Sequence, residues 1–215
     1  EQDTSFIKEY RQFTTKDENY NDESLHLLVQ DFVYSIANHF KENIKYWRVG
    51  TSDGHKSYWE EMQSKNKVCI GWKELENLDL IKPKNKKDII KKLTDTGFYL
   101  NDERTKSRKA GEIFDFYKKV NVGDIVLAQT GFDVLGIGRV IEDYEFTEDN
   151  EFPHQKEVEW LVINPNLQNE QGNRTTVYEV TEKNILGNIK NILEDKRNNT
   201  MEAKDLFDLY HDDLM

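Results

Sequence analysis

The spacing of hydrophobic residues changes along the chain from a helical period to a strand-like one. Apolar residues recur at three- and four-residue steps between Leu25 and Phe40, which predicts an amphipathic helix that Asp22 or Ser24 can cap. Residues 1–22 are polar and irregular, so we expect a partly ordered lead-in there. Beyond the helix, short apolar runs broken by polar loops are typical of strands.

Short strands and short helices are mixed through the middle of the chain. The predicted strands cover residues 46–49, 68–72, 125–128, 134–141, 158–163 (ending at Pro165) and 176–180. The predicted helices cover residues 57–62, 82–95 and 110–119, and the tail returns to a helical pattern. Because no β–α–β rhythm recurs, we expect an α+β fold, a small twisted β-barrel surrounded by short helices. The expected division is a polar lead-in and helix at 1–44, one domain at 45–180 with a Lys-rich insert at 82–109, and a helical flank or linker at 181–215.

Composition indicates a folded protein with a polar surface, because 33% of the residues are charged and 12% are aromatic. The single cysteine, Cys69, lies in an apolar run, where we expect a core residue and no internal disulfide, as in a reducing cytosol. No apolar stretch approaches the roughly 20 residues of a membrane span, so we expect a cytoplasmic protein that does not enter membranes. The chain opens on Glu1 rather than Met, as a piece of a longer protein or a renumbered chain would.

The net charge of -11 argues against binding to nucleic-acid phosphates. The charge is uneven, however, since twelve basic and six acidic residues lie between Lys82 and Lys119. Two interpretations stay open: a solvated helix face, or a surface that docks a nucleic-acid backbone weakly and with strong salt dependence. The candidates for backbone contact are Lys84, Lys86, Lys87, Arg104, Lys106, Arg108 and Lys109.

Motifs of catalysis are not found in the sequence. The five histidines are scattered, without the spacing of zinc sites in metalloproteases or deaminases. No Gly-x-Ser-x-Gly elbow occurs, and in Gly54-His55-Lys56-Ser57 glycine does not directly precede lysine as a phosphate loop requires. We therefore expect a protein that is not an enzyme and carries neither cofactor nor metal.

The placement of the four tryptophans stands out. Trp47, Trp72 and Trp160 lie in or at the end of predicted strands, and Trp59 follows the loop after the first strand. Such rings are either core residues or walls of a pocket in which a nucleobase stacks, an interaction worth about 1–3 kcal/mol per base. We expect at least one of Trp59 and Trp72 to line a pocket.

Several short motifs follow one another between residues 45 and 180. They are Tyr46-Trp47-Arg48-Val49-Gly50-Thr51-Ser52, Ile70-Gly71-Trp72, Val122-Gly123-Asp124-Ile125-Val126-Leu127 and Leu135-Gly136-Ile137-Gly138-Arg139-Val140. In order and spacing they resemble the EVE domain family of the PUA-like superfamily, which is related to YTH domains. The finer details look most like EVE-type domains fused to McrB-like restriction ATPases.

The resemblance implies a cage for one flipped-out modified base, such as 5-methylcytosine or N6-methyladenine, in DNA or RNA. Carried over by position, Thr51 and Ser52 are candidates to bind the base edge or the adjacent phosphate, and Trp72 matches a stacking wall. Phe132 and Asp133, at the tip of a predicted hairpin, lie where a second wall or edge reader is expected. Trp47 is expected to be structural, and the insert 82–109 lies outside what can be aligned.

The leading hypothesis is a non-catalytic DNA reader that serves as the specificity module of a restriction or antiviral defence system. An AAA+ ATPase motor is absent from these residues, so ATPase and nuclease activities would belong to other domains or subunits. One alternative is an RNA-binding accessory domain of the PUA or YTH type, which would prefer single-stranded RNA over duplex DNA. Another is a protein-interaction scaffold, which would bind no nucleic acid even at low salt.

Overall fold

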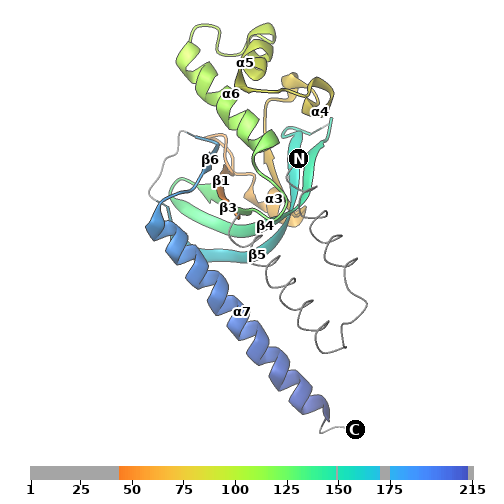
Figure 1. Ribbon diagram of the computed structural model, residues 1–215, viewed down its shortest axis with the longest axis vertical. Helices are drawn as coiled ribbons and strands as arrows, with labels where there is room; N and C mark the ends of the chain where they lie inside the picture. The colour runs from red at the N-terminus through yellow and green to blue at the C-terminus, as the bar shows by residue number, and fades with distance from the viewer. Residues whose placement is uncertain (1–43, 149, 170–174, 213–215) are drawn as a thin grey trace, which may run out of the picture. The chain divides into compact units, whose positions relative to one another are not determined.

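The computed structural model describes residues 44–148, 150–169 and 175–212, with residues 200–212 described by their backbone alone (Figure 1). The helix expected between Leu25 and Phe40 lies outside the described residues. The strands are β1 (Tyr46–Gly50), β2 (Lys67–Ile70), β3 (Ile125–Thr130), β4 (Asp133–Phe146), β5 (His154–Gln168) and β6 (Val177–Glu179). The helices are α3 (Trp59–Ser64), the 3-10 helix η1 (Lys73–Leu75), α4 (Leu78–Ile81), α5 (Lys86–Asp95), α6 (Glu103–Lys118) and α7 (Lys183–Asp212).

The six strands form one sheet in the order β2-β5-β4-β3-β1-β6. β1 runs parallel to β3, and the other neighbouring strands are antiparallel. The pairing of the long strands β4 and β5 shifts register at three places, and such bulges bend a sheet. The sheet is accordingly curled (Figure 1), and the mixed α+β class predicted from the sequence is confirmed.

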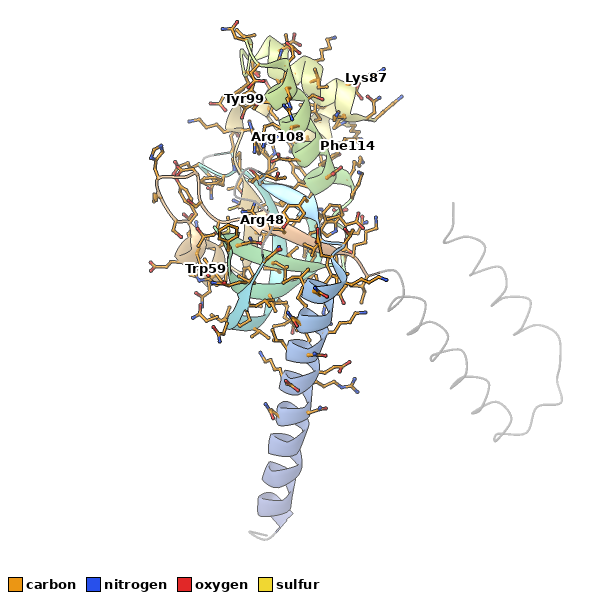
Figure 2. The ribbon with its side chains drawn as sticks, turned by 90° about the vertical axis from the view of Figure 1, so that its left-hand side faces the viewer. Arg48, Trp59, Lys87, Tyr99, Arg108 and Phe114 are labelled. Atoms are coloured by element: carbon orange, nitrogen blue, oxygen red, sulfur yellow. The ribbon has the colours of Figure 1, made fainter. Side chains whose placement is uncertain are left out.

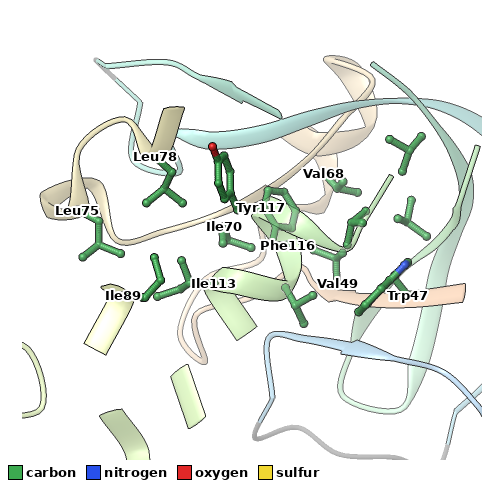
Figure 3. Packing of buried hydrophobic residues seen from close by; sticks show 14 of the residues in the cluster. Trp47, Val49, Val68, Ile70, Leu75, Leu78, Ile89, Ile113, Phe116 and Tyr117 are labelled. Carbon is green, nitrogen blue, oxygen red and sulfur yellow. The ribbon is translucent and has the colours of Figure 1, made fainter. Parts of the chain in front are cut away.

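Side chains of β1 alternate between the two faces of the sheet. Trp47 and Val49 lie in a first core, where Ile113 and Phe116 of α6 cover them (Figure 3). Arg48 points to the opposite face, where α7 packs. The buried residues of this second core are Ile125, Leu127, Val134, Ile137, Leu167, Val180, Ile185 and Ile189.

The Lys-rich insert is part of the first core rather than a surface appendage. Ile89 and Leu93 of α5 are fully buried there. A capping box formed by Asn85 and Asp88 starts α5. α6 begins at Glu103, earlier than the expected residue 110, because the Asp102 side chain accepts a hydrogen bond from the Thr105 N–H at 2.9 Å and caps the helix.

β5 continues past Pro165, where the sequence predicted its end. Its pairing with β4 jumps from Ile163 to Leu167, and Asn164 and Asn166 both have a φ of 50°. Pro165 lies inside this irregularity, where the ladder needs no N–H from it. α7 is the longest helix, yet none of the described helices combines the length and apolar character needed to cross a bilayer.

The Gly123-Asp124 turn fixes the start of β1. The Asp124 carboxylate accepts hydrogen bonds from the backbone N–H groups of Lys45 and Asn121, each at 3.0 Å. It also accepts one from the Trp47 indole N–H at 2.9 Å. Trp47 is 1% exposed, so the structural role predicted for it is confirmed.

Candidate functional site

Thr51 and Ser52 begin the loop that follows β1. The Thr51 N–H donates to the Gln129 carbonyl at 3.0 Å, and the Thr51 carbonyl accepts from the Tyr58 N–H at 2.8 Å. An isolated antiparallel β-bridge between Ser52 and Ser57 joins the two sides of the loop. The Thr51 side chain is fully buried, whereas Ser52 is exposed. The two candidate edge readers therefore occupy different environments.

Asp53 holds the remainder of this loop in one conformation. Its Oδ1 accepts from the backbone N–H groups of Lys56 and His55, both at 2.8 Å, and its Oδ2 accepts from the Tyr58 hydroxyl at 3.0 Å. These hydrogen bonds, the backbone ones foremost, lower the pKa of Asp53 to about 2. The loop is thus pre-organised at neutral pH.

A few buried polar atoms of the described residues lack a hydrogen-bond partner. They are Arg48 Nε, Thr51 Oγ1, Glu112 Oε1 and Trp160 Nε1. Each such atom costs about 1–3 kcal/mol, so folded proteins keep few of them and often keep them for function. Arg48 comes from β1, and Thr51 directly follows the strand.

Glu112 brings a carboxylate from α6 to the same strand end. The residue is 4% exposed, and its Oε2 accepts from the Thr176 N–H at 2.7 Å and from Lys109 Nζ at 2.8 Å. The Thr176 carbonyl in turn accepts from the Gly50 N–H at 2.8 Å. Thr176 therefore links the carboxylate to the last residue of β1, while Oε1 stays unpaired.

The alternation of β1 places Thr51 on the side of Glu112. Val49 faces the core under α6, and Thr51, two residues further along, points to the same side of the sheet. A buried hydroxyl and a buried carboxylate oxygen, both unpaired, are thus brought to one side of the strand end. Together they offer one group that donates or accepts and one that only accepts.

Trp72 belongs to this arrangement through Lys109. The sequence predicted Trp72 within the second strand, but it lies two residues beyond the end of β2. Its backbone has a left-handed φ of 66°, which is unfavourable for a bulky residue. His154 Nε2–H donates to its carbonyl at 3.1 Å, and its indole N–H donates to the Tyr99 hydroxyl at 3.2 Å. Lys109 Nζ lies 5.8 Å from its ring centroid and also pairs with Glu112.

These contacts, together with the alternation of β1 that places Thr51 on the same side of the sheet, define one group of side chains, which we call the β1-end cluster. Its members are Thr51, Trp72, Lys109, Glu112 and Thr176. Figure 2 shows the neighbouring Arg48 at the level of the sheet and Tyr99 in the region of α5 and α6. The cluster combines a flat aromatic ring, one cation, one anion and an unpaired hydroxyl.

Trp59 is held in packing against Trp160. The two rings meet edge to face, with centroids 4.9 Å apart and an interplanar angle of 80°. The glycines of the Gly-Ile-Gly motif make room for them. A Cβ at Gly136 would collide with the Trp59 ring, and one at Gly138 would lie 3.0 Å from the Trp160 ring. Trp59 therefore packs on the sheet against Trp160 and Gly136.

Phe132 and Asp133 form the exposed tip of the β3–β4 hairpin. Phe132 is 51% exposed, and Asp133 Oδ1 accepts from the Gln168 side chain at 3.0 Å. The tip is tied to Gln129, whose side chain donates to the Gly131 carbonyl at 2.8 Å. Among the described residues, neither Phe132 nor Asp133 makes a ring contact or a hydrogen bond with Trp72.

The candidate backbone-binding cations lie in different environments. Lys86, Lys87, Arg104 and Arg108 are exposed on the α5–α6 pair, where Figure 2 labels Lys87 and Arg108, and Lys84 is exposed just before α5. Lys106 is 2% exposed and pairs with Glu103 at 2.6 Å, so its position does not suit a surface contact to phosphates. Lys109 lies in the β1-end cluster instead of on the open helix surface.

Cys69 lies beside a cavity of about 10 Å³ lined also by Tyr58 and Phe152. This volume holds roughly one water molecule, which is too little for a base. Burial, foremost, raises the pKa of the Cys69 thiol to about 12, so the thiol is not a nucleophile at neutral pH. The part of the chain that the structure describes contains no group of three or more side chains suited to a metal ion.

A family model described as a domain of unknown function, DUF8426, matches residues 47–181. The chain belongs to this family. The part matched to DUF8426 runs from the second residue of β1 to just beyond β6 and contains every member of the β1-end cluster. No curated protein matches the chain.

Sequence reasoning missed Glu112 and Arg48. Glu112 lies on the inward face of α6, between Lys109 and Phe116 at three- and four-residue steps, and a carboxylate on an inward stripe is a signal that was available. Arg48 alternates with Trp47 and Val49, so its own face of the strand resembles a solvated one. Its burial depends on the elements that cover the second face of the sheet.

Proposed function

We propose that the β1-end cluster binds one nucleobase extruded from a nucleic acid, and that the protein is a non-catalytic reader of that base. The observation that carries the proposal is the pair of buried, unpaired oxygens, Thr51 Oγ1 and Glu112 Oε1, at a strand end linked to the Trp72 ring. A base has N–H groups that donate to a carboxylate and ring or carbonyl acceptors for a hydroxyl. Its flat face stacks on indole, which contributes about 1–3 kcal/mol.

The finer proposal is an EVE-type domain of the PUA-like superfamily that recognises a modified base in DNA. The curled sheet and the ordered motifs around Thr51, Trp72 and Gly136 support it. 5-Methylcytosine and N6-methyladenine are the proposed ligands, because a methyl group adds apolar surface to the stacked face. In this role the chain serves as the specificity module of a restriction or defence system, with ATPase and nuclease partners supplying the chemistry.

The charge distribution fits such a role. Lys84, just before α5, and Lys87 and Arg104, on the α5–α6 pair, are exposed and offer a locally positive surface for the nucleic-acid backbone. The net charge of -11 keeps non-specific binding weak, so recognition of the base carries most of the selectivity. We expect the affinity to fall steeply with salt because the backbone contacts are ionic.

The test is fluorescence anisotropy with duplex DNA that carries a single modified base, the same duplex without it, and single-stranded RNA of matched sequence. The modified duplex is expected to bind more tightly by roughly fourfold or more, since one buried methyl group is worth about 0.8 kcal/mol. Tighter binding to RNA would select the RNA-binding alternative. Equal affinity for both duplexes, unchanged in Trp72→Ala, would refute the proposal.

Variants separate the members of the site from their neighbours. Trp72→Ala is expected to weaken binding by roughly 5- to 150-fold, the range of one lost stacking interaction. Glu112→Gln replaces the accepting oxygen and is compared with Glu142→Gln, the same change at an exposed residue of β4. Trp59→Ala is expected to lower the Tm rather than the affinity of the folded protein, because Trp59 packs on Trp160.

A further inference from the structure

Arg48 is buried in a way that differs from the other buried cations of the described residues. Lys106 and Lys156 are 2% and 0% exposed, and each has a carboxylate partner, Glu103 at 2.6 Å and Asp143 at 2.8 Å. Arg48 is 4% exposed, its Nε has no partner, and no described carboxylate forms an ion pair with it. A buried guanidinium N–H that lacks a hydrogen-bond partner is costly, which is unusual for a residue with only a structural role.

The guanidinium of Arg48 is directed toward the C-terminal end of β1. A Cβ built at Gly50 would lie 3.3 Å from its Nη1, so the bare Gly50 backbone leaves it room. The Tyr178 ring covers it, with the Arg48 Cζ 6.0 Å from the ring centroid. Burial lowers the pKa of Arg48 below its ordinary value, an effect that Tyr178 and Glu112 oppose. An arginine side chain stays protonated at neutral pH, so the group is a cation.

We propose that Arg48 forms an anion site for the phosphate of the bound nucleotide, an inference that rests on the proposed base-binding function. At the C-terminal end of β1, Arg48 lies on one face of the sheet beside Gly50, and the Thr51 side chain of the β1-end cluster points to the other face. In a nucleotide, the base edge and the phosphate also lie at opposite ends, so one can reach the β1-end cluster while the other reaches Arg48. A guanidinium presents several N–H donors to phosphate oxygens, and charge-assisted hydrogen bonds of this kind are among the stronger ones.

The experiment compares three probes by NMR titration: a 2′-deoxynucleoside, its 5′-monophosphate and inorganic phosphate. For the wild-type protein we expect the monophosphate to bind about 10- to 100-fold more tightly than the nucleoside, as one charge-assisted interaction allows. Arg48→Met is expected to abolish this preference, and Arg48→Lys to retain part of it. Arg139→Met, the same substitution at an exposed arginine of β4, is expected to leave it unchanged.

The outcomes separate the two proposals. Equal binding of nucleoside and monophosphate would overturn the phosphate site and leave base binding standing. Binding of inorganic phosphate that depends on Arg48, without any nucleoside binding, would support the anion site and refute the base-binding function. A lower Tm for Arg48→Met than for the wild type would also overturn the inference, because it would show that the guanidinium holds the fold together.

Discussion

The two ends of β1 bury polar groups in opposite ways. At the N-terminal end, the Asp124 carboxylate accepts three hydrogen bonds, one of them from the Trp47 indole. At the C-terminal end, Thr51 Oγ1 and Glu112 Oε1 have no partner, although both residues are buried as deeply. A polar group that is satisfied inside the protein specifies the fold, whereas one left unsatisfied lowers stability and is available to a ligand. The comparison therefore distinguishes buried polar groups that stabilise the fold from those that are available to a ligand.

The largest loss of stability is expected at the end of β1 where the buried polar groups have hydrogen-bond partners. Asp124→Ala removes three hydrogen bonds at once and leaves the Trp47 N–H buried without a partner, so the free energy of unfolding should fall by about 3–5 kcal/mol. Urea unfolding measures this, with an unchanged m-value as the sign of an intact native state. Asp95→Ala, at an exposed residue of α5, is the matched control, with a change within about 0.5 kcal/mol. A fall for Asp124→Ala as small as the control's would break the comparison.

His154 is another buried side chain whose polar atoms both have hydrogen-bond partners. Its Nε2–H donates to Trp72, so its Nδ1 accepts from the Tyr144 hydroxyl at 2.7 Å. Burial lowers the pKa of His154 to about 4, below the value of about 6.5 in the unfolded chain. The unfolded state therefore takes up the proton first as the pH falls. The stability that neutral His154 contributes is complete above pH 6.5 and is lost towards pH 4, by roughly 3 kcal/mol in all.

The measurement for His154 is urea unfolding of the wild type and of His154→Gln between pH 7 and 4. Glutamine keeps an N–H donor for the Trp72 carbonyl but does not titrate in this range. The stability difference between the two proteins should therefore change in favour of the variant as the pH falls. Two curves that stay parallel throughout would show that His154 does not take part in the acid response.

Local patterns explain which parts of this comparison the sequence could predict. The alternation around Trp47 and the turn at Asp124 are local, so β1 and its structural tryptophan could be predicted. Thr51 and Trp72 were reached through a resemblance of short motifs. Glu112 was not reached, because its place at the strand end depends on a contact with Thr176, 64 residues away in the sequence. Arg48 was missed for the same reason, since its burial follows from elements that pair with β1 only in the folded sheet.

Removing the buried guanidinium of Arg48 should change the stability in the opposite direction from Asp124→Ala. Arg48→Met replaces a desolvated guanidinium by an apolar side chain of similar length, and we expect the free energy of unfolding to rise by about 1–3 kcal/mol. The corresponding rise in Tm is roughly 2–4 °C per kcal/mol for a domain of this size. Arg139→Met should change the stability by less than about 0.5 kcal/mol. A loss of stability in Arg48→Met, but not in Arg139→Met, would show that the Arg48 guanidinium has stabilising partners in the fold.

The smallest effect gives the sharpest form of the comparison, because one substitution is made at two threonines. Thr51→Val removes a buried hydroxyl without a partner and should raise stability by about 0.5–1 kcal/mol while weakening base binding by roughly 3- to 10-fold. Thr176→Val removes a hydroxyl that accepts from Lys109 Nζ at 3.1 Å, and should lower stability by about 1 kcal/mol. Calorimetric Tm values measure the change in stability of both variants. Shape and hydrophobicity change alike in the two variants, and Thr176 is less deeply buried than Thr51, so opposite signs of the change are expected from the hydrogen bonding of the two hydroxyls. Equal signs would show that Thr51 is not held unpaired for a ligand.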